Sequence, residues 1–299
     1  MKAPSFDYTK PKTLDAVFAA LAEYGDEAQL LAGGQTLIAT LNMRLSEPAM
    51  LIDINGVDLL RGIALTNAGN TLRLGALVRH SEIEDSALIK QHAPLLALAV
   101  PYIAHRAIRN LGTFGGSIAY ADPAAEWPTC LVALNGTVIV RSSKGERRIA
   151  ADDFFTDLYT TALVPGEIIV ACEIPVQQQS GVALFNELAR RHGDYAICGL
   201  AVTGTLLVGQ LNNPRMVYLG IGTTPIRALQ SEALLQSEPL SVGLIDEIQK
   251  SLKQELDPLG DLTNTSATKK HLATVLAKRL LQSLLGSEST KNLVQSAHE

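Results

Sequence analysis

The order of the predicted elements changes near residue 177, and this change constrains the fold more than any other feature of the sequence. Before it, helix and strand patterns alternate, with predicted elements at residues 13–24, 29–32, 36–44 and 50–54. After it, three strand-like runs precede three helical patterns, at residues 182–190, 198–208, 215–222, 227–235, 244–256 and 268–285. Alternation is typical of α/β units, whereas strands followed by helices indicate an α+β arrangement. The sequence therefore predicts two domains of different construction.

A polar stretch marks the expected boundary between these domains. Residues 177–181 read Gln-Gln-Gln-Ser-Gly and follow a proline closely, which is typical of a linker. Before this stretch, further elements are predicted at residues 61–74, 80–89, 94–103 with a break at Pro101, 123–134, 137–141 and 168–174. We predict a first domain over residues 1–177 with subdomains 1–57 and 58–177, a second domain over 178–287, and a frayed polar tail over 288–299.

Composition excludes several classes of protein. Hydrophobic residues make up 47% of the 299 residues, which is enough for a substantial core. The net charge of −5 gives no basic footprint for nucleic acid. The longest nearly uncharged apolar stretch, residues 195–208, is shorter than the roughly 20 residues that span a bilayer, and the N-terminus lacks the apolar core of a secretory signal. We therefore expect a soluble protein without a nucleic-acid partner or a transmembrane segment.

The three cysteines are far apart and each lies in an apolar run, at Cys130, Cys172 and Cys198. None belongs to a Cys-x-x-Cys motif or has a histidine at ligand spacing. A disulfide framework and a thiolate metal or iron–sulfur site within this chain are therefore not expected. Buried, reduced thiols are expected instead, as is usual in the cytoplasm.

Two glycine pairs are the strongest candidates for binding chemistry. Gly33-Gly34 follows an apolar strand and precedes Gln35 and Thr36, and Gly115-Gly116 precedes Ser117. Without Cβ atoms, the backbone can turn sharply and present several N–H groups to one anion. Two such loops could hold a diphosphate between them, although two ordinary tight turns are the alternative.

Two clusters of charged residues allow more than one interpretation. Residues 190–196 read Arg-Arg-His-Gly-Asp-Tyr-Ala and lie between predicted strands, so Gly193 and Asp194 suit a turn with Tyr195 at its tip. Tyr195 could lie over a ligand ring, or it could pack in a basic hairpin. His105, beside Arg106 and Arg109, could contact a ligand, but a solvated helix end is the favoured interpretation.

Three separated strings together resemble one family. AGGQTL (32–37), LGTFGGSIAYADPAAEWP (111–128) and ARRHGDYA (189–196) are similar to the FAD-binding medium subunits of the molybdenum hydroxylases, the xanthine dehydrogenase and carbon monoxide dehydrogenase family. The resemblance runs from about residue 5 to residue 285. It implies an α+β fold: a bilobed FAD-binding region of the vanillyl-alcohol-oxidase (PCMH) type with two α/β subdomains, then a C-terminal α+β domain with a small antiparallel sheet and helices.

The same resemblance implies the cofactor contacts. In the family, two glycine loops clamp the FAD diphosphate through backbone N–H groups; here these are Ala32, Gly33, Gly34, Gln35 and Thr36, then Thr113, Phe114, Gly115, Gly116 and Ser117. Residues beside the first loop that could touch FAD are Leu30, Leu31 and Leu37. The remaining implied contacts are Asp122 or Glu126 on the ribose or adenosine half, Ile169 near adenine, Ile103, and Asp194 with Tyr195 near the isoalloxazine ring. No residue is implied as an acid, base or metal ligand; Tyr195 could tune the flavin.

The sequence departs from the family pattern at a few positions. Thr36 replaces the commoner serine and keeps its hydroxyl, and Phe114 stands where an aliphatic residue is usual. Some relatives place a lysine shortly before the last string, where this chain has Asn186 and Glu187, so a lysine contact to the flavin is not assumed.

The family assignment implies a function within a complex. A large molybdenum-pterin subunit hydroxylates the organic substrate, a small subunit with two [2Fe–2S] clusters relays electrons, and this chain's FAD passes them to an external acceptor, in a dimer of heterotrimers. The alternatives are a stand-alone FAD oxidoreductase of the same flavin-site fold and an interaction protein that has lost its flavin. The sequence identifies neither the organic substrate nor the acceptor.

Overall fold

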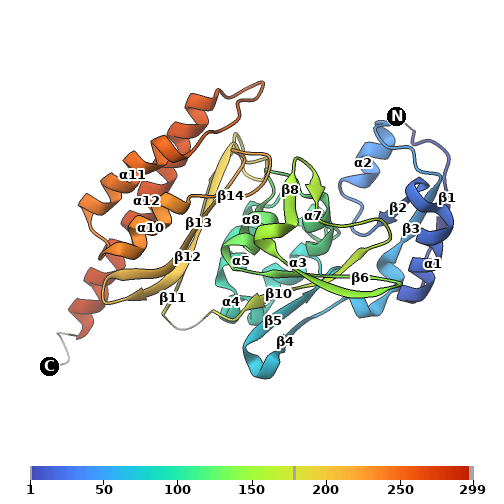
Figure 1. Ribbon diagram of the computed structural model, residues 1–299, viewed down its shortest axis with the longest axis horizontal. Coiled ribbons are helices and arrows are strands. Elements are labelled where there is room, and N and C mark those ends of the chain that lie inside the picture. Colours follow the sequence, from blue (N-terminus) through green and yellow to red (C-terminus); the bar gives the residue numbers. More distant parts are fainter. Residues whose placement is uncertain (1, 178–179, 296–299) are drawn as a thin grey trace. The chain divides into compact units, whose positions relative to one another are not determined.

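The computed structural model describes residues 2–177 and 180–295, with side chains described as far as residue 285 (Figure 1). Contacts between residues divide the chain into two units. The first unit comprises Met1–Gln91, Ala104–Ala121 and Asn135–Val176, and the second comprises His92–Ile103, Asp122–Leu134 and Gln177–Glu299.

A three-stranded parallel sheet begins the first unit. Its strands, in the order β1-β3-β2, are β1 (Asp7–Thr9), β3 (Met50–Asp53) and β2 (Ala28–Leu31). The connections between parallel strands are helical: α1 (Leu14–Tyr24) joins β1 to β2, and α2 (Leu37–Asn42) joins β2 to β3. Thr13 begins α1 as predicted, because its hydroxyl accepts a hydrogen bond from the Ala16 N–H at 3.3 Å. Val17 and Phe18 then pack against Ile52 of β3.

A five-stranded antiparallel sheet forms the rest of the core of the first unit. Its strands, in spatial order, are β4 (Ile63–Thr66), β5 (Thr71–Gly75), β10 (Ile168–Pro175), β6 (Thr137–Ser142) and β7 (Gly145–Ala150). The pairing of β10 with β6 shifts register between Ile169 and Ala171. The shorter elements around it are α3 (His80–Asp85), α4 (Ala87–His92), α6 (Arg106–Arg109), α7 (Phe114–Tyr120), α9 (Ala151–Phe154), β8 (Phe155–Asp157) and β9 (Thr160–Thr161). The helix predicted over residues 80–89 is two helices, because Ser86 is extended.

The second unit is built on a four-stranded antiparallel sheet. Its strands are β11 (Gly181–Leu188), β12 (Cys198–Leu207), β13 (Gln210–Leu219) and β14 (Ile226–Arg227), in that order. One face of the sheet packs on α10 (Leu229–Ser237), α11 (Val242–Glu255) and α12 (Ser266–Gln295). Figure 1 shows these three helices stacked along that face. Alternate residues of β12, such as Leu200 and Val202, point into this core.

Helices that precede residue 177 in the sequence cover the other face of this sheet. They are α5 (Pro94–Ala99), with the short turn Val100–Tyr102 after it, and α8 (Glu126–Ala133). The Tyr102 ring lies 5.4 Å from the Phe185 ring of β11, and the Thr203 hydroxyl donates to the Ala133 carbonyl at 2.6 Å. The sequence predicts contiguous domains. In the structure, residues 92–103 and 122–134 belong to the second unit, although they precede residue 177.

Several predicted boundaries differ from the structure. The helix predicted from residue 123 begins at Glu126, because Asp122 accepts the Ala124 N–H at 2.9 Å and Ala125 is extended. β13 begins at Gln210 rather than residue 215, because Val208 and Gly209 both have positive φ and close a tight hairpin. α12 continues to Gln295, through most of the predicted tail. Of the predicted linker and tail, residues 178–179 and 296–299 lie outside the described residues.

Two further predictions can be compared with the structure. Cys130, Cys172 and Cys198 are buried and free, as expected, and burial raises the pKa of each thiol. Among the described residues, no helix combines the length and the apolar character needed to cross a membrane.

Candidate functional site

The first glycine pair lies in a loop between β2 and α2 whose backbone donors are unused. No acceptor for the N–H groups of Gly33, Gly34, Gln35, Thr36 and Leu37 is present among the described residues. Gly34 has a φ of +70°, which a residue with a side chain rarely adopts. Thr36 precedes α2 without capping it through its hydroxyl. A run of consecutive N–H groups without acceptors is a backbone anion site.

The second glycine pair is organised differently. Gly115 and Gly116 lie in the first turn of α7 rather than in an open loop, because the Thr113 hydroxyl caps this helix by accepting the Gly116 N–H at 3.1 Å. The N–H groups of Phe114 and Gly115 donate to the carbonyls of Val78 and Ala76, at 2.8 and 2.9 Å.

The second pair therefore adds fewer free backbone donors than the sequence suggested. The Ser117 N–H also bonds within the protein, to the Thr113 carbonyl at 3.1 Å. The expectation that every N–H group of this segment faces the diphosphate is wrong for Phe114, Gly115 and Ser117. The Phe114 and Gly115 N–H groups instead fix the segment against residues 76–78, and the Ser117 N–H closes the first turn of α7.

The structure brings the two glycine segments together, as the sequence predicts. A Cβ on Gly33 would lie 2.5 Å from the Leu111 carbonyl oxygen and 2.8 Å from the Gly112 Cα. A Cβ on Gly116 would lie 3.9 Å from the Cβ of Ala32. Glycine at position 33 thus serves the close approach of two backbone segments, in addition to any approach of an anion.

A polar network that sequence reasoning missed connects the same two segments. The Asn55 side-chain amide donates to the Ala32 carbonyl at 2.7 Å, and the Arg79 guanidinium donates to the Asn55 Oδ1 at 2.5 Å. Arg79 also donates to the Leu111 carbonyl. The only signal in the sequence was the position of Asn55 just after β3, beside the end of β2 in the parallel sheet.

Asp53, the last residue of β3, supports this network. Its carboxylate accepts from the Tyr8 hydroxyl at 2.6 Å and from the Asn55 side-chain amide at 2.6 Å, and it pairs with the Lys10 ammonium at 3.1 Å. Burial alone would raise the pKa of Asp53, but these donors outweigh burial and lower it to about 2. Asp53 is therefore ionised at neutral pH.

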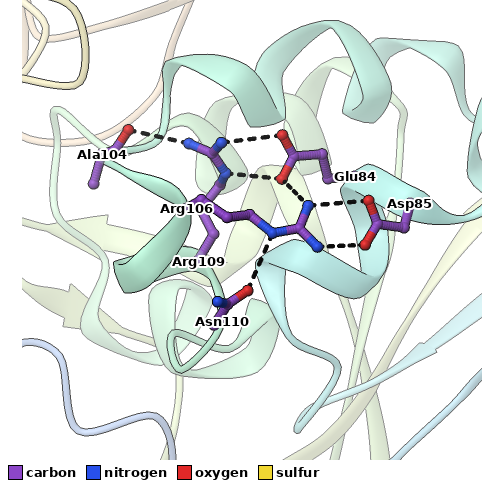
Figure 2. A network of polar contacts seen from close by, with 6 residues as sticks. All are labelled: Glu84, Asp85, Ala104, Arg106, Arg109 and Asn110. Atoms are coloured by element: carbon purple, nitrogen blue, oxygen red, sulfur yellow. Dashed lines mark hydrogen bonds and ion pairs between the residues drawn. The ribbon is translucent and has the colours of Figure 1, made fainter.

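The arginines that follow His105 are structural. Arg106 contacts both carboxylate oxygens of Asp85, at 3.0 and 2.5 Å, and also binds Glu84 and Asn110 (Figure 2). Arg109 forms two hydrogen bonds with Glu84, each of 3.0 Å. These ion pairs join α6 to α3, and so fix the chain that leads into residues 111–117. A role as ligand contacts is not needed to explain them.

Two predicted site residues of the first unit belong to its core. The Phe114 side chain has no exposed surface, so its ring is a packing residue rather than a cover for the flavin. Ile169 is 5% exposed and lies where β10 shifts register against β6. Around the first loop, Leu31 is only partly buried, and its side chain lies 3.1 Å from where a Gly34 Cβ would be.

The second unit holds Ile103, the carboxyls predicted for the ribose or adenosine half, and the two residues predicted for the flavin ring. Ile103 is nearly buried after the turn that follows α5, and Asp122 closes the turn before α8. Burial raises the pKa of Asp122. Glu126 begins α8, and burial together with the nearby Glu187 carboxyl raises its pKa well above the usual range for a glutamate.

Glu187 is a buried carboxyl that the sequence marked only as a departure from the family. It lies on β11 opposite Gly199 and is 7% exposed. Its Oε2 has no hydrogen-bond partner among the described residues, and burial raises its pKa. Two neighbouring carboxyls that are both poorly solvated cannot easily ionise together.

Gly193 lies in a turn, as predicted, which Asp194 closes because its N–H donates to the Arg191 carbonyl at 3.1 Å; Tyr195 follows it. Gly193 has a φ of +77°, and the Asp194 carboxylate lies 3.6 Å from Arg190 and accepts the Tyr195 N–H at 3.0 Å. Tyr195 is 70% exposed, so its ring is presented at the surface of the second unit rather than packed within it.

A parallel sheet ending in a glycine loop with unused N–H groups defines a class of protein that binds a phosphate-bearing ligand. Residues 4–177 match the family described as FAD binding domain in molybdopterin dehydrogenase, and residues 183–284 match the CO dehydrogenase flavoprotein C-terminal domain.

Similar proteins extend this match over nearly the whole chain. The alpha subunit of the 6-hydroxypseudooxynicotine dehydrogenase complex of Paenarthrobacter nicotinovorans is 38% identical, over 95% of this chain and 96% of that protein. The beta subunit of a caffeine dehydrogenase from Pseudomonas sp. (strain CBB1) is 35% identical, over 94% of this chain and 95% of that protein. A solved chain of carbon monoxide dehydrogenase from Hydrogenophaga pseudoflava superposes with a TM-score of 0.91 at 31% identity, covering 94% of this chain and 98% of that chain.

The chain belongs to the family of FAD-binding medium subunits of the molybdenum hydroxylases. It is a flavoprotein subunit of an oxidoreductase, and the predicted fold class, cofactor and function are confirmed. Because its relatives are subunits of complexes, the comparisons favour this function over a stand-alone flavoenzyme.

Proposed function

We propose that the loop over residues 33–37 holds the diphosphate of FAD. The observation that carries this proposal is its run of five N–H groups without acceptors, which fits two adjoining phosphate groups. The Thr36 and Ser117 hydroxyls are polar groups on the same two segments and can add donors. The Gly116 N–H, bonded only to the Thr113 hydroxyl, is the second segment's most available backbone donor.

The other predicted site residues would contribute the remaining contacts. Asp122 or Glu126 would accept hydrogen bonds from ribose hydroxyls of the adenosine half, since a carboxylate can accept from two vicinal hydroxyls. Asp194 and the exposed Tyr195, at the end of their turn, would lie near the isoalloxazine ring and shield or polarise it. Ile103 and Ile169 would contribute apolar surface.

Bound FAD would supply the ability to take up electrons singly and release them in pairs. The chain's own residues would hold the ring, exclude water from it and leave one edge open to the acceptor. No side chain is needed as an obligatory acid or base. The electrons would come from [2Fe–2S] clusters of a small partner subunit, and oxygen insertion would occur at the molybdenum-pterin centre of a large one.

The assembly would be a dimer of heterotrimers in the cytoplasm. Three buried free thiols, at Cys130, Cys172 and Cys198, support a reducing compartment. They also support iron–sulfur clusters that belong to a partner, because no group of three or more metal-ligating side chains occurs among the described residues. The external acceptor would be NAD⁺, dioxygen, a quinone or a cytochrome.

Purification of the native complex tests this function. We expect the chain to co-purify with a small and a large subunit, with one FAD per chain and with iron and molybdenum in the complex. Substrate should bleach the flavin only when the iron–sulfur subunit is present. A chain that purifies alone, without flavin, and takes up no added FAD would contradict the proposal.

A further inference from the structure

The loop over residues 33–37 must be held in place without using its own N–H groups. A backbone segment that keeps its N–H groups free for a ligand cannot be held by them, so it must be held through its carbonyl oxygens and by packing. The structure shows these carbonyl bonds. The Ala32 carbonyl accepts from the Asn55 side chain at 2.7 Å, and the Gly33 carbonyl accepts from the Gln35 side chain at 3.1 Å.

The Asn55 side chain that donates to Ala32 is held by two further residues, Asp53 and Arg79. Asp53 accepts hydrogen bonds from both the side-chain amide and the backbone N–H of Asn55, at 2.6 and 2.9 Å. If the amide flipped, its NH₂ group would lose this charged acceptor. The Asn55 Oδ1 faces the Arg79 guanidinium at 2.5 Å. The orientation of the amide that binds Ala32 is therefore determined by Asp53 and Arg79 together.

Arg79 carries the connection to the second glycine segment. Its guanidinium donates to the Leu111 carbonyl, which is the atom that a Cβ on Gly33 would meet at 2.5 Å. Arg79 is only partly exposed and also heads α3, where its backbone N–H donates to Glu82 at 2.7 Å. One guanidinium and one amide thus reach the carbonyls of both segments, which are far apart in the sequence.

We propose that Asn55 and Arg79 are positioning residues that hold the two glycine segments at the spacing required by the FAD diphosphate. This inference rests on the proposed function of the loop over residues 33–37. Neither residue needs to touch the cofactor. Their contribution is to keep Ala32 and Leu111 in place, so that the N–H groups of residues 33–37 already converge before the diphosphate arrives.

The test compares three ligands on the flavin-stripped complex. FAD carries the ring and the diphosphate, ADP carries the diphosphate without the ring, and riboflavin carries the ring without any phosphate. In Asn55→Ala and Arg79→Met, we expect the Kd values of FAD and ADP to rise by a common factor, between about tenfold and a hundredfold, as for a lost hydrogen bond to a charged group. The Kd of riboflavin should stay as in the wild type. Arg79→Lys, which keeps one charged donor, should fall between wild type and Arg79→Met.

Arg147→Met is the matched control. Arg147 also bonds a backbone carbonyl, Ala162 at 2.8 Å, and a carboxylate, Glu167 at 2.7 Å, in the same unit but on β7. Its loss should leave all three affinities unchanged. Asn55→Ala is the sharper variant, because it removes no charge: if only the Arg79 variants weaken FAD, Arg79 acts through its charge and the positioning role is overturned.

The remaining outcomes separate the two proposals. If the wild type binds neither FAD nor ADP, the proposed function of the loop fails. If the wild type binds both, and Asn55→Ala and Arg79→Met bind them equally well, the positioning role alone fails. An equal loss of ADP and riboflavin affinity in the variants would show a general loss of structure and would also overturn the positioning role.

Discussion

Asp53 in the first unit and Glu187 in the second are both buried carboxyls on β-strands, yet their surroundings are opposite. Asp53 receives hydrogen bonds from Tyr8 and Asn55 and an ion pair from Lys10. Glu187 has an oxygen without a partner among the described residues, and its ionisable neighbour is a second carboxyl, Glu126. Burial alone does not determine the charge of a carboxyl. The donors around it decide, so the pKa of Asp53 falls to about 2 and that of Glu187 rises to about 7.

This difference assigns different tasks to the two regions. Around Asp53 the charges are matched and the backbone segments are in close contact, which suits a rigid support for a binding loop. Around Glu187 one carboxyl oxygen has no donor among the described residues, which disfavours the charged form of this group.

The largest effect is expected from Gly33→Ala. The added Cβ would lie 2.5 Å from the Leu111 carbonyl oxygen, so the two segments must separate, at a cost of about 3 kcal/mol. Urea unfolding and flavin content measure this. Gly243→Ala is the control: on α11, a Cβ there would meet only the Ser241 hydroxyl at 3.8 Å, and a small gain in stability is expected. Equal stability of both variants would show that the region around Asp53 is not closely packed.

Asp53→Asn should have the next largest effect. The substitution keeps the size of the side chain but removes the charge that the donors face, which should cost about 2 kcal/mol of unfolding free energy at pH 7. Because the folded-state pKa of Asp53 is lowered, its contribution is present above its usual pKa of 3.8 and is lost as the pH falls through about 2. Acid unfolding of the wild type should show this loss, and Asp53→Asn should lack it. Identical acid unfolding of the two proteins would contradict the comparison.

Glu187→Gln should act with the opposite sign. The folded-state pKa of Glu187 is raised, so its contribution is fully present below the unfolded value of 4.5 and is lost as the pH rises through about 7. We expect Glu187→Gln to be more stable than the wild type at pH 8 by on the order of 1 kcal/mol, and similar to it at pH 5. Urea unfolding at both pH values measures the difference. If the variant is less stable at pH 8, Glu187 has a donor that the comparison omits.

Arg106→Lys extends the comparison to exposed charges and should have the smallest effect. Its side chain is half exposed, so losing its paired contact with Asp85 should lower the free energy of unfolding much less than Asp53→Asn does. Added salt should reduce this difference, whereas it should leave the effect of Asp53→Asn largely intact. Unfolding at two ionic strengths tests this, and a salt-independent loss would contradict it.

Much of the fold could be predicted because its signals are local. Thr13 caps α1, and Pro101 lies in the short turn Val100–Tyr102, where the helical pattern breaks after α5. Gly193 lies in the turn that precedes Tyr195. The three family strings identified the cofactor and the two glycine segments that the structure places together. These features depend on residues a few positions apart, whose preferred backbone conformations do not require the rest of the chain.

The roles within the site could not be predicted in the same way. Gly115 looks like a loop glycine in the sequence, but its N–H is taken by Ala76, a residue of a distant segment. In the sequence, Glu187 is notable only because some relatives have a lysine nearby. The packing of α8 against the sheet of the second unit places its carboxyl near that of Glu126.

The sequence by itself determined the class of this protein, its cofactor, and the backbone loop that keeps donors for a diphosphate. Only the tertiary structure decided which segments hold that loop in place and which carboxyls are ionised. Asn55 reaches Ala32 and Arg79 across 23 and 24 positions of sequence, respectively. Hydrogen bonds and charges act through space over a few ångströms, so the partners of a polar side chain are known only once folding has brought distant segments together.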